Sequence, residues 1–168
     1  TFTATNAAIY CNVASIDGGG VFSETSGSAI LTNVGFYSNT AAAGLTHGVA
    51  SYVGTSTSLY MYNTIVEETQ TSSYAVYGAG SGTFTYNNVY AGGTGYRYGG
   101  SMAQGAGSIS SGSNFTSVTC DSSVANDNFT LRSGSGSINT GNPSSVYNDY
   151  DGTRNDMGPK GGPAGNWN

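Results

Sequence analysis

Short runs of alternating apolar and polar residues recur along the chain, and each is interrupted by an asparagine. The clearest run is AILTNVGFYSNT at 29–40, and similar runs begin at Phe2, Leu59 and Phe84. They are anchored at spacings of 27, 30 and 25 residues by four asparagines: Asn6, Asn33, Asn63 and Asn88. Recurrence at this length is typical of solenoid proteins, in which each repeat packs on its neighbours.

Alternation within each run assigns one face to a core and the other to solvent. The positions that we expect to face inward are Phe2, Ala4, Ala7, Ile9, Ala29, Leu31, Val34, Phe36, Leu59, Met61, Thr64, Val66, Phe84, Tyr86, Val89 and Ala91. Each anchoring asparagine lies where the alternation changes phase, and asparagine tolerates the left-handed backbone that a corner requires. We therefore expect the four asparagines to stack at one corner in a ladder of amide hydrogen bonds.

A third short run follows in the repeats, at 19–24, 48–53 and 74–79, between turns rich in Gly, Ser and Thr. Three short strands per repeat predict an all-β fold, a right-handed parallel β-helix with about four to six coils. An antiparallel β-sandwich would also contain many short strands, but it would not require the asparagine to recur in register. The solenoid is therefore the favoured fold.

Three stretches resemble a known family. The pattern LTNVGFYSNTA at 31–41 resembles the right-handed parallel β-helix repeats of pectin-lyase-like proteins and bacterial surface proteins, and 126–143 and 149–163 resemble the closing stretches of such proteins. Gly136 and Asn139 depart from the family pattern, which usually has Pro and Asp there. The resemblance implies the fold for nearly the whole chain. It leaves the activity open, because this fold serves lyases, hydrolases, adhesins and structural shafts.

The two ends of a coil stack carry unpaired backbone groups that invite further strands. We assign residues 1–125 to the coils and 126–168 to a closing coil and an irregular C-terminal cap, in one domain, with Trp167 folded over the last coil. The sequence enters the first coil at residue 2 without a leader or a cap, which predicts either a mature or trimmed fragment or head-to-tail stacking of copies into a filament.

Two cysteines are too few for a disulfide framework. Cys11 lies in the first coil and Cys120 near the last, too distant in a stacked model to pair within one chain. The alternatives are two free thiols or an intermolecular disulfide across a head-to-tail junction, which requires the Cα atoms to approach within about 7 Å.

Composition excludes two classes of partner. Charged residues make up 8% of the chain and the net charge is −5, with four cations: Arg97, Arg132, Arg154 and Lys160. Because no basic patch can neutralise several phosphates, nucleic acid is not expected as a partner. No apolar run is long enough for a membrane span. Low charge also favours association between copies.

Candidate catalytic residues are few. Glu67 and Glu68 are adjacent, so on a strand they point to opposite faces and cannot act as a pair. His47, the only histidine, lies beside a turn with no distinguished serine partner, and we interpret it as a solvated turn residue. We therefore expect no enzymatic activity and no cofactor apart from a structural cation.

The stretch NDYDGTRND contains the one acidic cluster, Asp149, Asp151 and Asp156. Carboxylates two residues apart before a glycine resemble the start of a calcium loop, although the closing bidentate Glu is missing. The cluster predicts either a structural calcium ion that closes the C-terminal end or a polar turn in which Arg154 pairs with an aspartate.

The remaining candidate sites concern glycans. Asn114 and Asn128 each begin an NFT triplet, the N-glycosylation pattern. Outward positions in successive coils carry tyrosines that could stack on sugars, on each other or against another subunit: Tyr10, Tyr37, Tyr60, Tyr62, Tyr90, Tyr96 and Tyr98. Threonine does not recur at one outward position in every coil, so a flat ice-binding face is not favoured.

We expect a non-enzymatic, extracellular or cell-surface β-helix protein with a structural or adhesive role, stacking head to tail with itself. The alternative is a carbohydrate-active module, a polysaccharide lyase or glycan binder, that uses an exterior face with tyrosines and Arg97.

Overall fold

The computed structural model describes residues 1–24, 26–41, 48–69, 72–92, 96–112 and 114–167. These residues form an all-β fold with two short 3-10 helices, η1 and η2. The elements in chain order are β1 (Phe2–Tyr10), β2 (Val21–Ser23), β3 (Gly27–Tyr37), β4 (Gly48–Val53), β5 (Thr57–Tyr62), β6 (Ile65–Glu68), β7 (Tyr74–Gly78), β8 (Ser81–Thr85), β9 (Asn88–Ala91), β10 (Tyr96–Gly100), β11 (Phe115–Ser117), η1 (Val124–Asn126), β12 (Asn128–Leu131) and η2 (Ser145–Tyr147).

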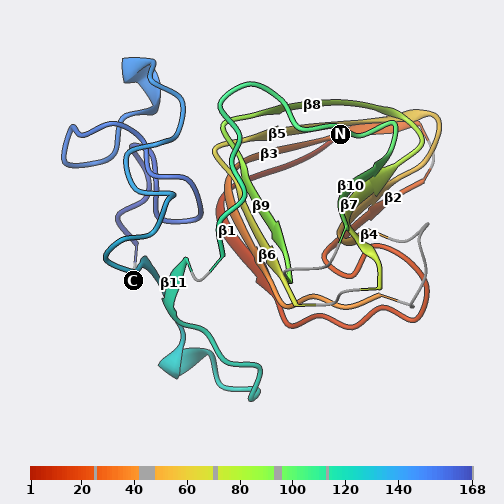
Figure 1. Cartoon of the computed structure of the whole chain (residues 1–168), viewed down its shortest axis with the longest axis horizontal. Coiled ribbons are helices and arrows are strands. Elements are labelled where there is room, and N and C mark those ends of the chain that lie inside the picture. The colour runs from red at the N-terminus through yellow and green to blue at the C-terminus, as the bar shows by residue number, and fades with distance from the viewer. Residues whose placement is uncertain (25, 42–47, 70–71, 93–95, 113, 168) are drawn as a thin grey trace.

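Two parallel sheets contain the first ten strands. The larger has the order β8-β5-β3-β6-β9, with β1 also paired to β3, and the smaller has the order β10-β7-β4-β2. We call β1–β2, β3–β4, β5–β7 and β8–β10 the four passes of the chain. In Figure 1 the passes lie one behind another as nested outlines. The all-β, parallel part of the fold prediction is therefore confirmed.

The register shows how the passes align. Ala4 pairs with Leu31, Leu31 with Met61 and Met61 with Phe84, so equivalent residues are 27, 30 and 23 apart. Strand β3 bends at Asn33, which allows β5 to pair with its first half and β6 with its second half. The spacing into the fourth pass is thus two residues shorter than the asparagine spacing predicts.

The core lies between the two sheets and consists of the inward residues of successive passes. Its buried members are Ala29, Leu31, Val34, Phe36, Val53, Leu59, Met61, Val66, Ala75, Val76, Phe84, Val89, Ala91 and Met102. The period-two assignment of faces is therefore confirmed for most positions. Tyr86 is an exception, because it packs in a second cluster outside the sheets.

Residues 101–112 cover the last pass. Met102 enters the core with 5% of its surface exposed, and it lies so close to Gly78 and Gly82 that a Cβ on either glycine would meet its side chain within 3 Å. Ile109 forms a parallel bridge with Asn88 at the free edge of β9. The end of the stack is thus closed before the C-terminal segment begins.

The C-terminal segment, residues 114–167, lies against the outer side of the larger sheet (Figure 1). A second apolar cluster joins the two, with Phe115, Phe129 and Met157 of the segment packed on Ile65 of β6. Pro159 lies over Gly35, where a Cβ would meet its ring at 2.8 Å. The prediction that 126–168 caps the last coil is wrong, because apolar residues on the outer side of the sheet hold the segment there.

Trp167 also lies elsewhere than predicted. Its indole Nε1 donates to the carbonyl oxygen of Pro159 over 2.9 Å, and the same oxygen accepts a hydrogen bond from Asn6 in the first pass. The Lys160 ammonium lies 4.8 Å from the centre of the Trp167 ring. The indole therefore helps to hold the segment beside the first pass, far along the stack from β8–β10. Within the described residues, no helix combines the length and apolarity needed to cross a bilayer.

Candidate functional site

The predicted corner exists, but its fourth member is a tyrosine. Asn6, Asn33 and Asn63 have φ values of 50°, 51° and 50°, and the next residue in register is Tyr86, with φ 55°. Asn88 is instead a strand residue that pairs with Ile65. The predicted place of Asn88 in the column is therefore wrong, because the shorter fourth pass moves the corner two residues earlier.

The corner asparagines bind the C-terminal segment, and the predicted amide ladder among them is wrong. Asn6 donates to the carbonyl oxygens of Pro159 and Gly161 at 3.0 and 2.6 Å. Asn33 donates to the carbonyl oxygen of Asp156 at 3.0 Å, and the Asn63 side-chain oxygen accepts from the Asn142 backbone at 2.7 Å. A left-handed corner turns these side chains outward, toward the segment, instead of along the stack.

Asn33 offers a direct test of this attachment. We expect Asn33→Ala to lower the free energy of unfolding by about 2–4 kcal/mol. The substitution removes the buried hydrogen bonds of the side-chain amide, and alanine tolerates the left-handed backbone less well than asparagine does. Asn33→Gly is the matched control, since it keeps the backbone freedom and should cost about 1 kcal/mol less than alanine. Chemical denaturation measures both. Equal stability of Asn33→Ala and the parent protein would contradict the attachment.

A ladder of hydrogen-bonded side chains does form, at the ends of β1, β3 and β6. Asn12 donates its side-chain amide to Asn39 over 2.9 Å, and Asn39 donates to the Glu68 carboxyl over 3.0 Å. Asn39 and Glu68 are fully buried. Asn12 and Asn39 are 27 residues apart, the same separation as Asn6 and Asn33. That repeated spacing is the sequence signal that could have found this ladder.

Glu68 is the most perturbed acid of the described residues. Burial raises the pKa of its carboxyl to about 8, against the lowering effect of the hydrogen bond from Asn39. Its second oxygen, Oε2, has no hydrogen-bond partner. Glu67 points to the opposite side, as predicted, where its carboxylate accepts bonds from the backbone and side chain of Asn114 at 2.9 and 3.1 Å. The two acids do not act as a pair.

Asn114 lies at the contact between the larger sheet and the C-terminal segment. Its side-chain oxygen accepts from Asn88 and Ser137, both at 2.9 Å, and the residue has no exposed surface. A glycan cannot occupy an amide that is buried and donates to Glu67, so glycosylation of Asn114 is wrong for the folded protein. Asn128 is exposed in β12, and its glycosylation stays a prediction.

The two cysteines form a disulfide within one chain. Cys11, just after β1, and Cys120, after β11, are bonded with their Cα atoms 5.5 Å apart. The predictions of free thiols and of an intermolecular bond are both wrong. The reason is the path of the C-terminal segment, which returns along the outer side of the sheet and brings residue 120 beside the first pass.

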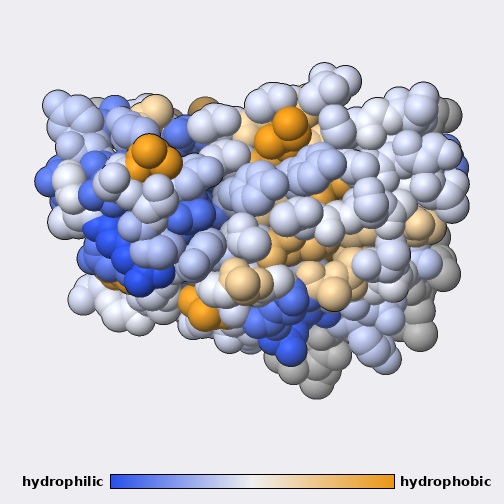
Figure 2. All heavy atoms as spheres, turned by 90° about the horizontal axis from the view of Figure 1, so that it is seen from above, coloured by the Kyte–Doolittle hydropathy of each residue, from blue (hydrophilic) through white to orange (hydrophobic). Residues whose placement is uncertain are grey.

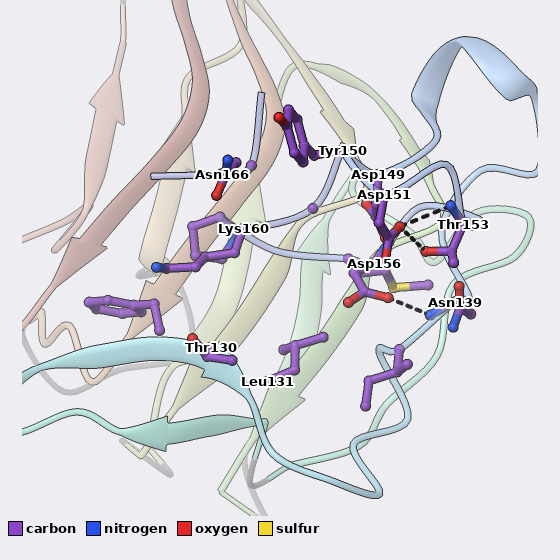
Figure 3. A pocket seen from close by; sticks show the side chains of 16 residues that line it. Thr130, Leu131, Asn139, Asp149, Tyr150, Asp151, Thr153, Asp156, Lys160 and Asn166 are labelled. Atoms are coloured by element: carbon purple, nitrogen blue, oxygen red, sulfur yellow. Dashed lines mark hydrogen bonds between the residues drawn. The ribbon is translucent and has the colours of Figure 1, made fainter. Parts of the chain in front are cut away.

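The predicted calcium ligands line a cavity of about 430 Å³ in the C-terminal segment (Figure 3). Asp149 accepts backbone hydrogen bonds from Asp156 and Gly162, Asp151 accepts from both the backbone and hydroxyl of Thr153, and Asp156 accepts from the Asn139 backbone at 2.7 Å. Figure 3 shows the last two sets of bonds as dashed lines within the loop. Each carboxylate thus accepts a hydrogen bond from a backbone N–H group of the C-terminal segment.

The three aspartates of this cavity differ in the direction in which their pKa values are shifted. Burial raises the pKa of both Asp149 and Asp156, while hydrogen bonds from the Thr153 side chain and backbone lower that of the exposed Asp151. No three Asp, Glu, His or Cys side chains of the described residues are grouped so that they could hold a metal ion. Arg154 donates to the carbonyl oxygens of Thr140 and Gly141. Arg154 thus binds carbonyl groups where the polar-turn alternative had it pair with an aspartate, and a structural calcium ion stays a prediction.

A smaller cavity of about 240 Å³ lies between β6 and the hairpin β11–β12, and Glu67, Arg132 and Tyr37 are among its lining residues. Arg132 donates from Nε to the carbonyl oxygen of Phe115. Glu67 and Arg132 are both hydrogen-bonded to other residues of the protein, so this cavity is a polar contact between the sheet and the C-terminal segment. His47, the candidate base, lies outside the described residues.

The predicted outward tyrosines fall into different environments. Tyr10 and Tyr37 are covered by the C-terminal segment, in edge contacts with Phe129 and Phe115. Tyr98 faces the core, where it packs edge-on to Phe84 and burial raises its pKa, so its outward assignment is wrong. Tyr96 is 46% exposed. Tyr60, Tyr62 and Tyr90 are half-buried on the outer side of the larger sheet.

The chain was compared with known proteins at the level of family models, curated sequences and solved structures, and none of the three comparisons finds a match. The resemblance to pectin-lyase-like proteins therefore stays a prediction.

Proposed function

We propose that this chain is a right-handed parallel β-helix module of an extracellular or cell-surface protein, with a non-enzymatic structural and adhesive role. The observation that carries the proposal is the parallel register, in which each pass pairs over its length with the pass before it. Parallel strands joined by crossover connections are almost always right-handed. Stacked parallel strands with a C-terminal segment bonded along one side form a rigid module, as a structural role requires.

The Cys11–Cys120 disulfide supports an extracellular location, because such bonds persist in oxidising compartments. The surface agrees with this role. Figure 2 shows the strongly hydrophilic surface mainly over the C-terminal segment, at the left, while the stack of passes at the right is mostly pale blue around an orange-to-tan area. A surface with so little charge favours contact with neutral partners over repulsion.

The ends of the stack favour a single module over a filament. A second copy that stacked head to tail would have to displace residues 101–112 from the last pass, together with the buried Met102. Apolar residues are exposed in the first pass, among them Phe2, Val13, Ile16 and Phe22. We therefore place any added coil at the first pass and do not extend the proposal to an open-ended polymer.

Particle shape and lyase activity test this function. Light scattering and negative-stain microscopy should show compact particles without filaments. Incubation with polygalacturonate or alginate should give no ultraviolet absorbance from unsaturated products, because Asp149, Asp151 and Asp156 accept backbone hydrogen bonds and Glu68 is buried. Release of such products would contradict the non-enzymatic role and favour the lyase alternative.

A further inference from the structure

One part of the outer surface carries hydroxyl groups in register. The outward positions of the residues up to the corner in β1, β3, β5 and β8 form three columns across the four passes. We call this surface the hydroxyl face, and it comprises Thr1, Thr3, Thr5, Ser28, Ile30, Thr32, Ser58, Tyr60, Tyr62, Ser81, Thr83 and Thr85. All of these except Ile30 carry a hydroxyl, and none is charged.

The face is regular because the strands beneath it are parallel and in register. Neighbouring strands lie about 4.8 Å apart, and outward residues on one strand are about 6.6 Å apart, so the side chains form a grid. Some hydroxyls bond to each other across the passes, as between Ser58 and Ser81 at 2.7 Å. The C-terminal segment attaches beyond the corner and leaves this face to solvent, and Figure 2 looks onto it.

Tyr60 and Tyr62 stand in the middle of the grid with short neighbours. In register above and below Tyr60 are Ile30 and Thr83, and Thr32 and Thr85 flank Tyr62. Neither ring contacts another aromatic ring of the described residues. Both side chains are half-buried, so part of each is open to an external ligand.

The aromatic rings on the smaller sheet contact each other. Phe22 stacks on Tyr52 with centroids 5.3 Å apart, and Tyr52 stacks on Tyr77 at 5.8 Å. Tyr96 packs on Tyr74 at 5.1 Å. These contacts stabilise the passes, and Tyr52 has a stacked ring on each side, while Phe22 and Tyr96 remain 52% and 46% exposed. The two sets of tyrosines thus have different roles.

We propose that the hydroxyl face binds a neutral polysaccharide through Tyr60 and Tyr62. Sugar rings present apolar C–H faces that pack on aromatic rings, and their hydroxyls exchange hydrogen bonds with Ser and Thr hydroxyls. An uncharged face on a chain of net charge −5 fits an uncharged polymer and offers no cation to an acidic one. The inference rests on the adhesive part of the proposed function and names its ligand class.

Two binding assays test this inference. One measures retention of the protein on insoluble cellulose and chitin, and the other measures its retardation in gels that contain soluble neutral β-glucan. The parent protein should be retained and retarded, and Tyr60→Ala/Tyr62→Ala should bind about tenfold or more weakly. Tyr96→Ala is the matched control and should bind as the parent does. Thr32→Lys, which adds a charge in the centre of the face, should also weaken binding. Thermal melting confirms that each variant is folded.

Several results would overturn the inference. One is a parent protein that binds none of these neutral polymers, and another is a double tyrosine variant that binds as well as the parent. Inhibition of ice growth without polysaccharide binding would mean that the face orders water instead. A dimer that Thr32→Lys dissociates would make the face a subunit contact. In each case a compact particle without lyase products would leave the structural role in place, so the two failures are distinguishable.

Discussion

Glu68→Gln will remove most of the pH dependence of stability between pH 5 and 8. The Glu68 carboxyl has a pKa of about 8 in the folded protein, raised by burial from a reference value of 4.5. The folded state therefore holds the proton more tightly than the unfolded state. Its stabilising effect is complete below pH 4.5 and is lost as the pH rises toward 8.

The expected size is large. Each pH unit between the two pKa values costs the parent protein up to about 1.4 kcal/mol, so the free energy of unfolding should fall by about 4 kcal/mol from pH 5 to pH 8. Glutamine keeps an oxygen that can accept from Asn39 but does not ionise. Urea denaturation across this pH range measures the slope, and the exposed Glu24→Gln is the control that should retain it. A parent protein that becomes more stable toward pH 8 would contradict the assignment.

Reduction of the Cys11–Cys120 disulfide will destabilise the protein by about 3–5 kcal/mol. The bond joins residues 109 apart, and closing a loop of about 100 residues removes up to about 4.7 kcal/mol of chain entropy from the unfolded state. Cys11→Ala/Cys120→Ala should reproduce the effect without a reductant. Thermal and chemical denaturation measure it.

Gel mobility separates this pairing from a bond between chains. The parent protein should migrate as a monomer with and without reductant, slightly faster when oxidised because the unfolded chain is held compact. Hydrogen exchange after reduction should increase first in β11, β12 and the residues between them, since they lose their link to the first pass. A covalent dimer on a non-reducing gel would contradict the intrachain bond.

The passes themselves follow from the sequence. Leu31, Phe36, Leu59 and Met61 were assigned inward by alternation alone, and all four are buried. Alternation is reliable here because each strand has one face against the core and one against solvent, so a shift of one residue would expose the entire apolar set. The corner at Asn6, Asn33 and Asn63 was predictable for the related reason that asparagine tolerates left-handed backbone.

The fourth corner shows where residue identity misleads. Asn88 matches the other anchors by type, yet the register places Tyr86 at the corner. The register is decided by packing, since Phe84 lies against Met61 and Val89 against Val66. The connection between β7 and β8 takes up the last two residues of the change, since Val53 pairs with Gly78, 25 residues on, and Ser58 with Ser81, 23 residues on. Loops of different length cost little free energy.

By itself the sequence determined the strands, their inward faces and three of the four left-handed corners, because these depend on local alternation and on backbone preferences of single residues. Only the tertiary structure decided where residues 114–167 pack, that Cys11 meets Cys120, and that Asn39 and Glu68 share a buried ladder. These contacts join residues as much as 155 positions apart. No periodicity specifies the attachment of the segment or the disulfide, because both depend on which surface of the completed stack offers apolar area and unpaired amides.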